Sequence, residues 1–143
     1  MIKHISIFFA VSIFSFTALA DNFLEMREFR DRLCYDGDTC YVWANSLPEP
    51  LNKMSVRILG IDTPEIKGEC EEEKELALKG RELANNLFRN AKSIEFKNLQ
   101  WDKYGGRILV DVEIDGKNYA DQVIEAGLAR PYFGGKKESW CDN

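Results

Sequence analysis

The feature that most constrains the fold of this chain is a change in apolar periodicity along its length. Between residues 29 and 61, and again between 93 and 114, apolar side chains alternate with polar ones, which is typical of half-buried strands. Between residues 69 and 90 they recur instead with the spacing of an amphipathic helix, and a shorter helical pattern spans 118–127. The expected order is therefore three strands, a helix, two strands and a second helix.

This order predicts an α+β fold that is mainly β. A parallel βαβ sheet needs strands and helices that alternate throughout, and here they do not. Five short strands with an interposed helix predict a small, partly open barrel of the oligonucleotide/oligosaccharide-binding (OB) type, with two or three helices. The five strand patterns are residues 29–35, 39–44, 54–61, 93–98 and 107–114.

Two details of the strand patterns bear on function. Asp36-Gly37 separates the first two patterns, and this dipeptide predicts a hairpin turn. In the third pattern Met54, Val56 and Ile58 share one face, while Arg57 lies on the other. An arginine in such a place either snorkels along apolar surface or points its guanidinium into a site, and both interpretations stay open.

The longer helix combines an apolar stripe with an acidic start. Leu76, Leu83 and Leu87 recur at helical spacing and predict the face that packs on the barrel. The acidic start is either a solvated helix N-terminus or a calcium-binding patch, and the helix dipole alone accounts for it. Its glutamates are Glu69, Glu71, Glu72, Glu73 and Glu75.

The first twenty residues read as a secretory signal peptide. A short polar start precedes an apolar stretch, and Ala18-Leu19-Ala20 forms a small-residue cleavage site. An uncleaved anchor is the alternative, but the apolar stretch is shorter than the roughly 20 residues that a membrane span needs. We therefore expect an exported domain of residues 21–143 in the periplasm or outside the cell, with no stable membrane association after cleavage.

Four cysteines follow the predicted cleavage site. None lies in a C-x-x-C pair, and export to an oxidising compartment favours disulfides over a zinc site. Cys34 and Cys40 flank the predicted hairpin turn, so we expect them to pair. The remaining pair, Cys70–Cys141, would fix a C-terminal tail that otherwise reads as loop.

The only histidine, His4, lies within the predicted signal peptide. A mature chain without histidine excludes a Ser-His-Asp triad, a histidine base and an imidazole-bound zinc or copper site. Catalysis would have to use carboxylates, lysine, arginine, tyrosine, thiols or a hard metal ion. The formal net charge of −5 also argues against a basic protein that coats nucleic acid.

Three segments place charged residues at strand ends, where a rigid scaffold can present them. They read DGDT at 36–39, VRILGIDTPE at 56–65 and DKYGGRIL at 102–109. Turn chemistry alone would explain each one taken singly. Their occurrence together and in this order is more specific.

The ordered set resembles the thermonuclease (staphylococcal nuclease-like) family of secreted phosphodiesterases. The resemblance extends to GLAR at 127–130 and covers roughly residues 28–133. It implies an OB-type barrel and calcium-dependent endonuclease cleavage of DNA and RNA that leaves 3′-phosphate ends. It also implies that calcium is the cofactor and that nucleic acids are the partners.

The resemblance further implies roles for individual residues. Asp38 and Asp62 match the calcium-binding carboxylates of the family, and Thr63 matches its carbonyl ligand. Glu65 matches the carboxylate that handles the attacking water. Arg57 and Arg107 match the two phosphate-binding arginines of the family. Lys103 and Tyr104 match its substrate-contacting loop positions.

Calcium prefers carboxylate and carbonyl oxygens and needs no histidine, which agrees with these assignments. Two guanidiniums can donate paired hydrogen bonds to phosphoryl oxygens. The pair Gly105-Gly106 departs from a single-glycine loop and can change the loop contacts to substrate. A catalytically silent OB module that binds nucleic acid or a protein is the alternative function, and we expect a monomer in either case.

Overall fold

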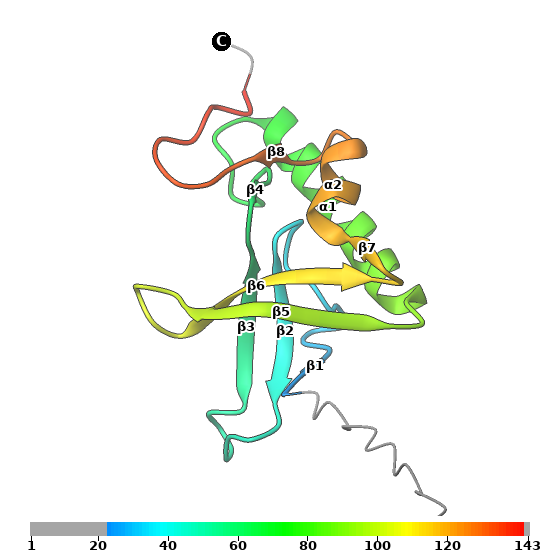
Figure 1. The fold of residues 1–143 in the computed structure, drawn as a ribbon. Coiled ribbons are helices and arrows are strands. Elements are labelled where there is room, and N and C mark those ends of the chain that lie inside the picture. The colour runs from blue at the N-terminus through cyan, green and yellow to red at the C-terminus, as the bar shows by residue number, and fades with distance from the viewer. Residues whose placement is uncertain (1–22, 142–143) are drawn as a thin grey trace, which may run out of the picture.

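The computed structural model describes residues 23–141. The predicted signal peptide, residues 1–20, lies outside this range. The structure is a curled, mainly antiparallel sheet with two helices at one end (Figure 1). The predicted α+β, OB-type fold class is confirmed.

Five strands form the main sheet in the spatial order β1-β2-β3-β6-β5. All neighbours are antiparallel except β3 and β6, which run parallel. The short β7 adds to β6, and β4 pairs with β8 in a separate two-stranded sheet. The bounds are β1 Leu24–Met26, β2 Thr39–Ala44, β3 Lys53–Ile58, β4 Ile61–Asp62, β5 Ile94–Trp101, β6 Arg107–Ile114, β7 Lys117–Asn118 and β8 Arg130–Pro131.

The predicted first strand, residues 29–35, is wrong. The strand that pairs with β2 is β1, which lies earlier in the chain. Arg30 and Asp31 have φ values of 52° and 61°, and this left-handed backbone interrupts any strand there. Of the predicted hairpin, only the isolated bridge between Cys34 and Cys40 is present.

The core lies between the inner face of the sheet and the helices. Inward residues of β2, β3 and β6 alternate with outward ones, and the predicted inward set of Met54, Val56 and Ile58 is buried. The helix α1, Glu71–Asn90, has its buried line on Ala77, Ala84 and Phe88, close beside the predicted leucine stripe. Gly80 is also buried, and a Cβ there would lie 3.7 Å from the Gly37 Cα, so a small residue lets α1 approach the loop before β2.

The second helix, α2 at Tyr119–Glu125, begins as predicted after Asn118. The Asn118 side chain accepts a hydrogen bond from the Asp121 N–H at 3.0 Å, which caps the helix. No helix within residues 23–141 has the length and apolar character needed to cross a membrane.

Candidate functional site

Three segments converge where β2 begins and β3 ends. Asp38 immediately precedes β2, and Thr39 of β2 lies opposite Arg57 of β3 in the antiparallel register. The chain then turns at Gly60, whose φ of +81° suits glycine, and enters β4 with Asp62. The structure therefore brings Asp38 of one predicted motif and Arg57 and Asp62 of another to one end of the sheet.

Asp38 is almost fully buried, with 1% of its surface exposed. One carboxylate oxygen forms an ion pair with the Arg57 guanidinium, and the other accepts a hydrogen bond from the Thr63 hydroxyl at 2.8 Å. Arg57 also donates to the Ile61 carbonyl at 3.2 Å. Arg57 thus points into the site rather than snorkelling, and it links the loop before β2 to β4.

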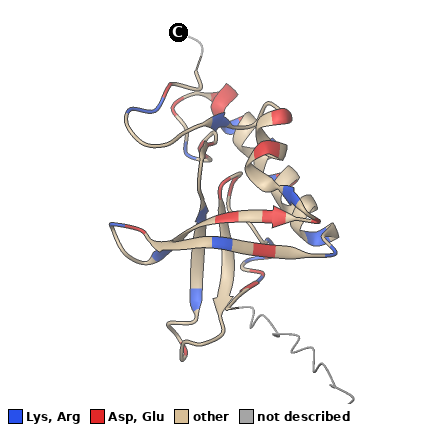
Figure 2. Cartoon of the chain, in the orientation of Figure 1, with Lys and Arg blue, Asp and Glu red and all other residues tan. Residues whose placement is uncertain are grey.

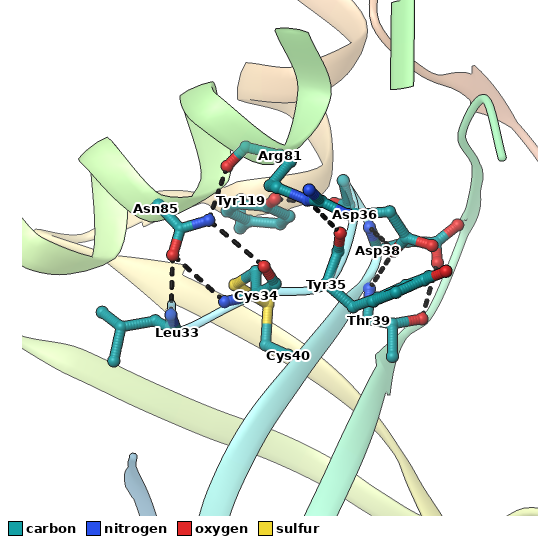
Figure 3. The surroundings of a disulfide bond; sticks show 11 residues. Leu33, Cys34, Tyr35, Asp36, Asp38, Thr39, Cys40, Arg81, Asn85 and Tyr119 are labelled. Atoms are coloured by element: carbon teal, nitrogen blue, oxygen red, sulfur yellow. Dashed lines mark hydrogen bonds between the residues drawn. A yellow bond between two sulfur atoms is a disulfide. The ribbon is translucent and has the colours of Figure 1, made fainter. Parts of the chain in front are cut away.

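A second buried carboxylate, Asp36, lies beside Asp38 in the same loop (Figure 3). Its Oδ1 accepts hydrogen bonds from the backbone N–H groups of Asp38 at 3.2 Å and Thr39 at 2.8 Å. Burial, and next the negative charge of Asp38, raise the pKa of Asp36 to about 7. Asp36 therefore stabilises the turn through these hydrogen bonds, although burying its negative charge costs free energy. The sequence motif predicted no role for Asp36 beyond the turn.

The loop carrying Asp36 and Asp38 is fixed by groups from distant parts of the chain (Figure 3). The buried Tyr119 hydroxyl of α2 donates to the Gly37 carbonyl at 2.6 Å. The Asn85 amide of α1 accepts from the N–H groups of Leu33 and Cys34 and donates to the Cys34 carbonyl. Because these partners are buried, the two helices set the position of the loop.

The disulfide between Cys34 and Cys40 closes this loop with both cysteines fully buried. Burial, and next the negative charges of Asp38 and Asp36, raise the pKa of Tyr119 well above its ordinary value, so its hydroxyl stays a donor. The loop is consequently pinned by a covalent bond on one side and by hydrogen bonds on the other.

Asp62 and Glu65 face the C-terminal tail. Asp62 is 4% exposed, and its Oδ2 accepts a hydrogen bond from the Trp140 indole N–H at 3.0 Å. The Lys137 ammonium lies 2.6 Å from Asp62 Oδ1 and 3.3 Å from Glu65 Oε1. A tail residue therefore bridges the predicted metal ligand and the predicted catalytic carboxylate.

The loop between β4 and α1 is organised by Glu73. Its carboxylate accepts from the backbone N–H groups of Glu65 at 3.2 Å and Glu69 at 2.9 Å. A Cβ on Gly68 would meet this carboxylate at 2.4 Å, so glycine leaves room for it. Glu73 is buried, so it belongs neither to a solvated helix N-terminus nor to an exposed calcium-binding patch. Its role is to position the backbone of Glu65.

Arg107, the first residue of β6, lies opposite Ser55 of β3, and Arg57 lies opposite Leu109. Because alternate residues share a face, Arg57 and Arg107 are on the same face of the sheet. In the structure Arg107 donates to Asp102 Oδ2 through Nε at 2.8 Å and Nη2 at 2.6 Å. The pKa of Asp102 is lowered chiefly by this hydrogen bonding.

The other two loop predictions, Lys103 and Tyr104, lie on the solvent side of the segment between β5 and β6. Tyr104 is 81% exposed, and the Lys103 ammonium is 4.9 Å from the centre of its ring. Figure 1 shows this loop projecting from the sheet. It is therefore in a position to contact a ligand but is not part of the carboxylate cluster.

A cleft of about 750 Å³ lies between the β4–α1 loop and the C-terminal tail. Asp62, Thr63 and Glu65 line one side of it, and Lys137 and Trp140 line the other. Sequence reasoning missed these two tail residues as part of the site. The Cys70–Cys141 disulfide is the signal that could have found them, since it joins the tail to the residue before α1.

The residues at this end of the sheet fit a hard cation. The predicted ligands Asp38, Asp62 and Thr63 offer oxygen donors only, and the Thr63 hydroxyl already bonds to Asp38. Two cationic side chains, Arg57 and Lys137, lie against the two aspartates. The position thus attracts positive charge, as a calcium site would.

Comparison with known proteins identifies a nuclease family and two endonucleases that are similar to this chain. A family model described as staphylococcal nuclease homologue matches residues 55–141. The SPbeta prophage-derived endonuclease YokF of Bacillus subtilis (strain 168) is 37% identical over 100 residues, which is 66% of this chain and 31% of that protein. Endonuclease YncB of the same organism is 36% identical over 100 residues, 66% of this chain and 43% of that protein. The chain spans less than half the length of both relatives.

Proposed function

This chain belongs to the family of staphylococcal nuclease homologues, and on that premise we propose that it is a calcium-dependent endonuclease acting on DNA and RNA. The observation that carries the proposal is the network at the end of β3. Arg57 joins the buried Asp38 to the Ile61 carbonyl beside Asp62, and Thr63 donates to Asp38. Carboxylates for a metal and a guanidinium for a phosphate are thereby brought into one site.

The arginines and Glu65 would divide the work on the substrate. Phosphodiester hydrolysis builds negative charge on the phosphoryl oxygens, and planar guanidiniums at Arg57 and Arg107 can donate to those oxygens as the charge grows. Glu65 has half of its side chain exposed, at 49%, so water reaches its carboxylate. We assign it the orientation or deprotonation of the attacking water, with 3′-phosphate ends as the products.

Calcium bound by Asp38, Asp62 and the Thr63 carbonyl would supply a fixed positive charge beside the scissile phosphate. Lys103 and Tyr104 extend the site along the exposed β5–β6 loop toward the rest of the nucleic acid. The negative net charge of −5 predicts weak substrate binding that falls further as salt rises.

A catalytically silent OB module is the second candidate. It would be expected to lack one of the five acidic and basic side chains that the reaction needs. The chain has all five, namely Asp38, Asp62, Glu65, Arg57 and Arg107. This completeness favours the enzyme.

The test compares Glu65→Gln, Asp62→Ala and the control Glu69→Gln, which changes an exposed acid in the same loop. Single-turnover cleavage of a short DNA and a matching RNA is measured at saturating calcium and with chelator. We expect Glu65→Gln to lower the rate about 10²–10⁴-fold, since it keeps the size but removes the basicity. Asp62→Ala should weaken calcium binding in titration calorimetry, and mass spectrometry of the products should show 3′-phosphate ends.

Glu69→Gln should cleave at the parental rate. Full activity in excess chelator would contradict calcium dependence, and parental cleavage by Glu65→Gln would contradict the assignment of Glu65. No cleavage by the parent in any divalent cation would favour the silent module.

We also propose that the protein is exported and works as a monomer in the periplasm or outside the cell. The two disulfides support this compartment, because such bonds persist where the environment is oxidising. Cell fractionation and size-exclusion chromatography test the two statements separately.

A further inference from the structure

The C-terminal residues 132–141, which we call the strap, cross the site and are attached at both ends. At the first end the Tyr132 N–H donates to the Gly60 carbonyl at 2.9 Å. At the other end Cys141 is bonded to Cys70, 71 positions earlier in the chain. Figure 1 shows this segment curving outward after β8 and returning beside the loop between β4 and α1.

Contacts along the strap fix its path between these attachments. Arg130 of β8 donates to the Ser139 carbonyl at 2.9 Å, and its guanidinium lies 3.9 Å from the centre of the Trp140 ring. Trp140 in turn donates to Asp62 at 3.0 Å. The strap therefore has a defined path rather than only a covalent tether.

The strap carries basic residues to the acidic end of the molecule. Figure 2 shows acidic residues gathered at this end, where α1 begins. Its Lys137 ammonium is within ion-pair distance of both Asp62 and Glu65. The Asp62 side chain is 6% exposed, so the ammonium replaces water as the partner of a nearly buried carboxylate. A cation on this chain thus occupies the surroundings of one predicted metal ligand.

We propose that Lys137 is a tethered competitor of the metal ion, and that the Cys70–Cys141 disulfide keeps it at the site. This inference rests on the proposed function, because it assumes that Asp62 binds the metal. Two positive charges cannot share the Asp62 carboxylate at contact distance without strong repulsion, so metal loading must displace the ammonium. Attachment of the strap gives the ammonium a high local concentration, which loss of the disulfide would lower.

The geometry of the strap makes this more than a surface ion pair. A lysine on a free tail would have to be ordered to reach Asp62, and such pairs contribute little. Here the backbone on both sides of Lys137 is already held, by the Tyr132 N–H on one side and the Ser139 carbonyl on the other. The released side chain, 42% exposed, has room to move toward solvent when a metal binds.

The test is calcium titration calorimetry on the oxidised protein, comparing Lys137→Met with Lys136→Met. The control changes the neighbouring strap lysine, for which the structure gives no ion pair with a described carboxylate. We expect Lys137→Met to bind calcium about two- to fivefold more tightly, the range for removing a half-exposed ion pair. Lys136→Met should leave the dissociation constant unchanged.

A double-mutant cycle tests the tether. Replacing both Cys70 and Cys141 by serine should tighten calcium binding in the parent but add little in the Lys137→Met background. If the serine variant does not fold, the Lys137→Met comparison still decides whether Lys137 competes. An effect of the serine changes that is equal in both backgrounds would overturn the role of the disulfide.

The outcomes separate the two proposals. Equal dissociation constants for the parent and Lys137→Met, or equal tightening by Lys136→Met, would overturn the competition while the metal site stands. Weaker binding by Lys137→Met would overturn it as well, since Lys137 would then support the metal site. Absence of calcium binding in every variant would overturn the proposed metal site and the competition together.

Discussion

The loop at residues 36–39 and the loop at residues 102–106 are built from similar residues and behave differently. Each contains an aspartate near an arginine of an adjacent strand. In the first, Asp38 is buried and its partner Arg57 has only 15% of its side chain exposed. In the second, Asp102 is also buried, with 7% of its side chain exposed, but Arg107 has 37% exposed and the loop tip projects from the sheet (Figure 1).

The difference lies in where each loop finds its partners. Tyr119 fixes the first loop by a buried hydrogen bond to Gly37, and Asn85 fixes the segment that enters it by buried hydrogen bonds to Leu33 and Cys34. Both partners lie more than 45 positions away from residues 36–39 in the chain. The second loop is held by Asp102, which accepts from the Tyr104 N–H and from Arg107 of the same hairpin. A site built on both loops therefore has one half set by the core and another half that can adjust to a substrate.

The largest expected effect is a difference in stability between two variants, in which Arg57 or Arg107 is replaced by methionine. Arg57→Met should lower the free energy of unfolding of the metal-free protein by about 3–5 kcal/mol, because it leaves the buried Asp38 without its cation. Arg107→Met should cost less, about 1 kcal/mol, because Arg107 is 37% exposed and water can therefore replace it beside the Asp102 carboxylate. Urea denaturation with chelator present measures both values, and equal losses would contradict the difference between the loops.

A smaller effect concerns the pH dependence of stability in the metal-free protein. The pKa of Asp36 is raised to about 7 in the folded state, so the folded protein binds more protons than the unfolded chain from about pH 4 to 7. Stability should therefore fall as pH rises through this range. Asp36→Asn keeps the acceptor for the Asp38 and Thr39 N–H groups, and it should remove that slope.

Urea denaturation at a series of pH values compares the parent with Asp36→Asn. The variant should be more stable than the parent above pH 7, by an amount on the order of a few kcal/mol. Asp102→Asn is the control. Hydrogen bonding from Arg107 lowers the pKa of Asp102, so this group does not titrate between pH 4 and 7, and the variant should keep the parental slope. An unchanged slope in Asp36→Asn would assign the pH dependence to another group.

Much of this arrangement is predictable from the sequence, and the exceptions have physical causes. The period-two patterns predict β2, β3 and β6, because their alternation is fixed by burial on one face. Residues 29–35 mislead, since positive φ at Arg30 and Asp31 leaves no mark in the apolar pattern. The motifs predict that Asp38, Arg57 and Asp62 meet. The position of Lys137 is not predictable in this way, because the tail has no periodic apolar pattern and tertiary contacts determine its path.

A single hydrogen bond tests how strongly the core fixes the first loop. Tyr119→Phe removes the donor to the Gly37 carbonyl at 2.6 Å and leaves that buried acceptor unpaired. We expect a loss of about 1–2 kcal/mol in the free energy of unfolding and weaker calcium binding, because Gly37 adjoins Asp38. Tyr104→Phe, in the exposed second loop, should leave both quantities at the parental values.

The smallest expected effect is a shift in the titration of one carboxyl group in the second loop. Hydrogen bonding from Arg107, with help from the Tyr104 N–H, holds the pKa of Asp102 below its ordinary value of 3.8. Because the folded-state pKa is lowered, this contact stabilises the protein above that pH and is lost as the pH falls through the folded pKa. In an NMR titration of the carboxyl group, Arg107→Met should raise the Asp102 midpoint toward the ordinary value, while Arg57→Met should not move it. If Arg57→Met shifts Asp102 as far as Arg107→Met does, the two loops are electrostatically coupled, and the second loop is not independent of the core.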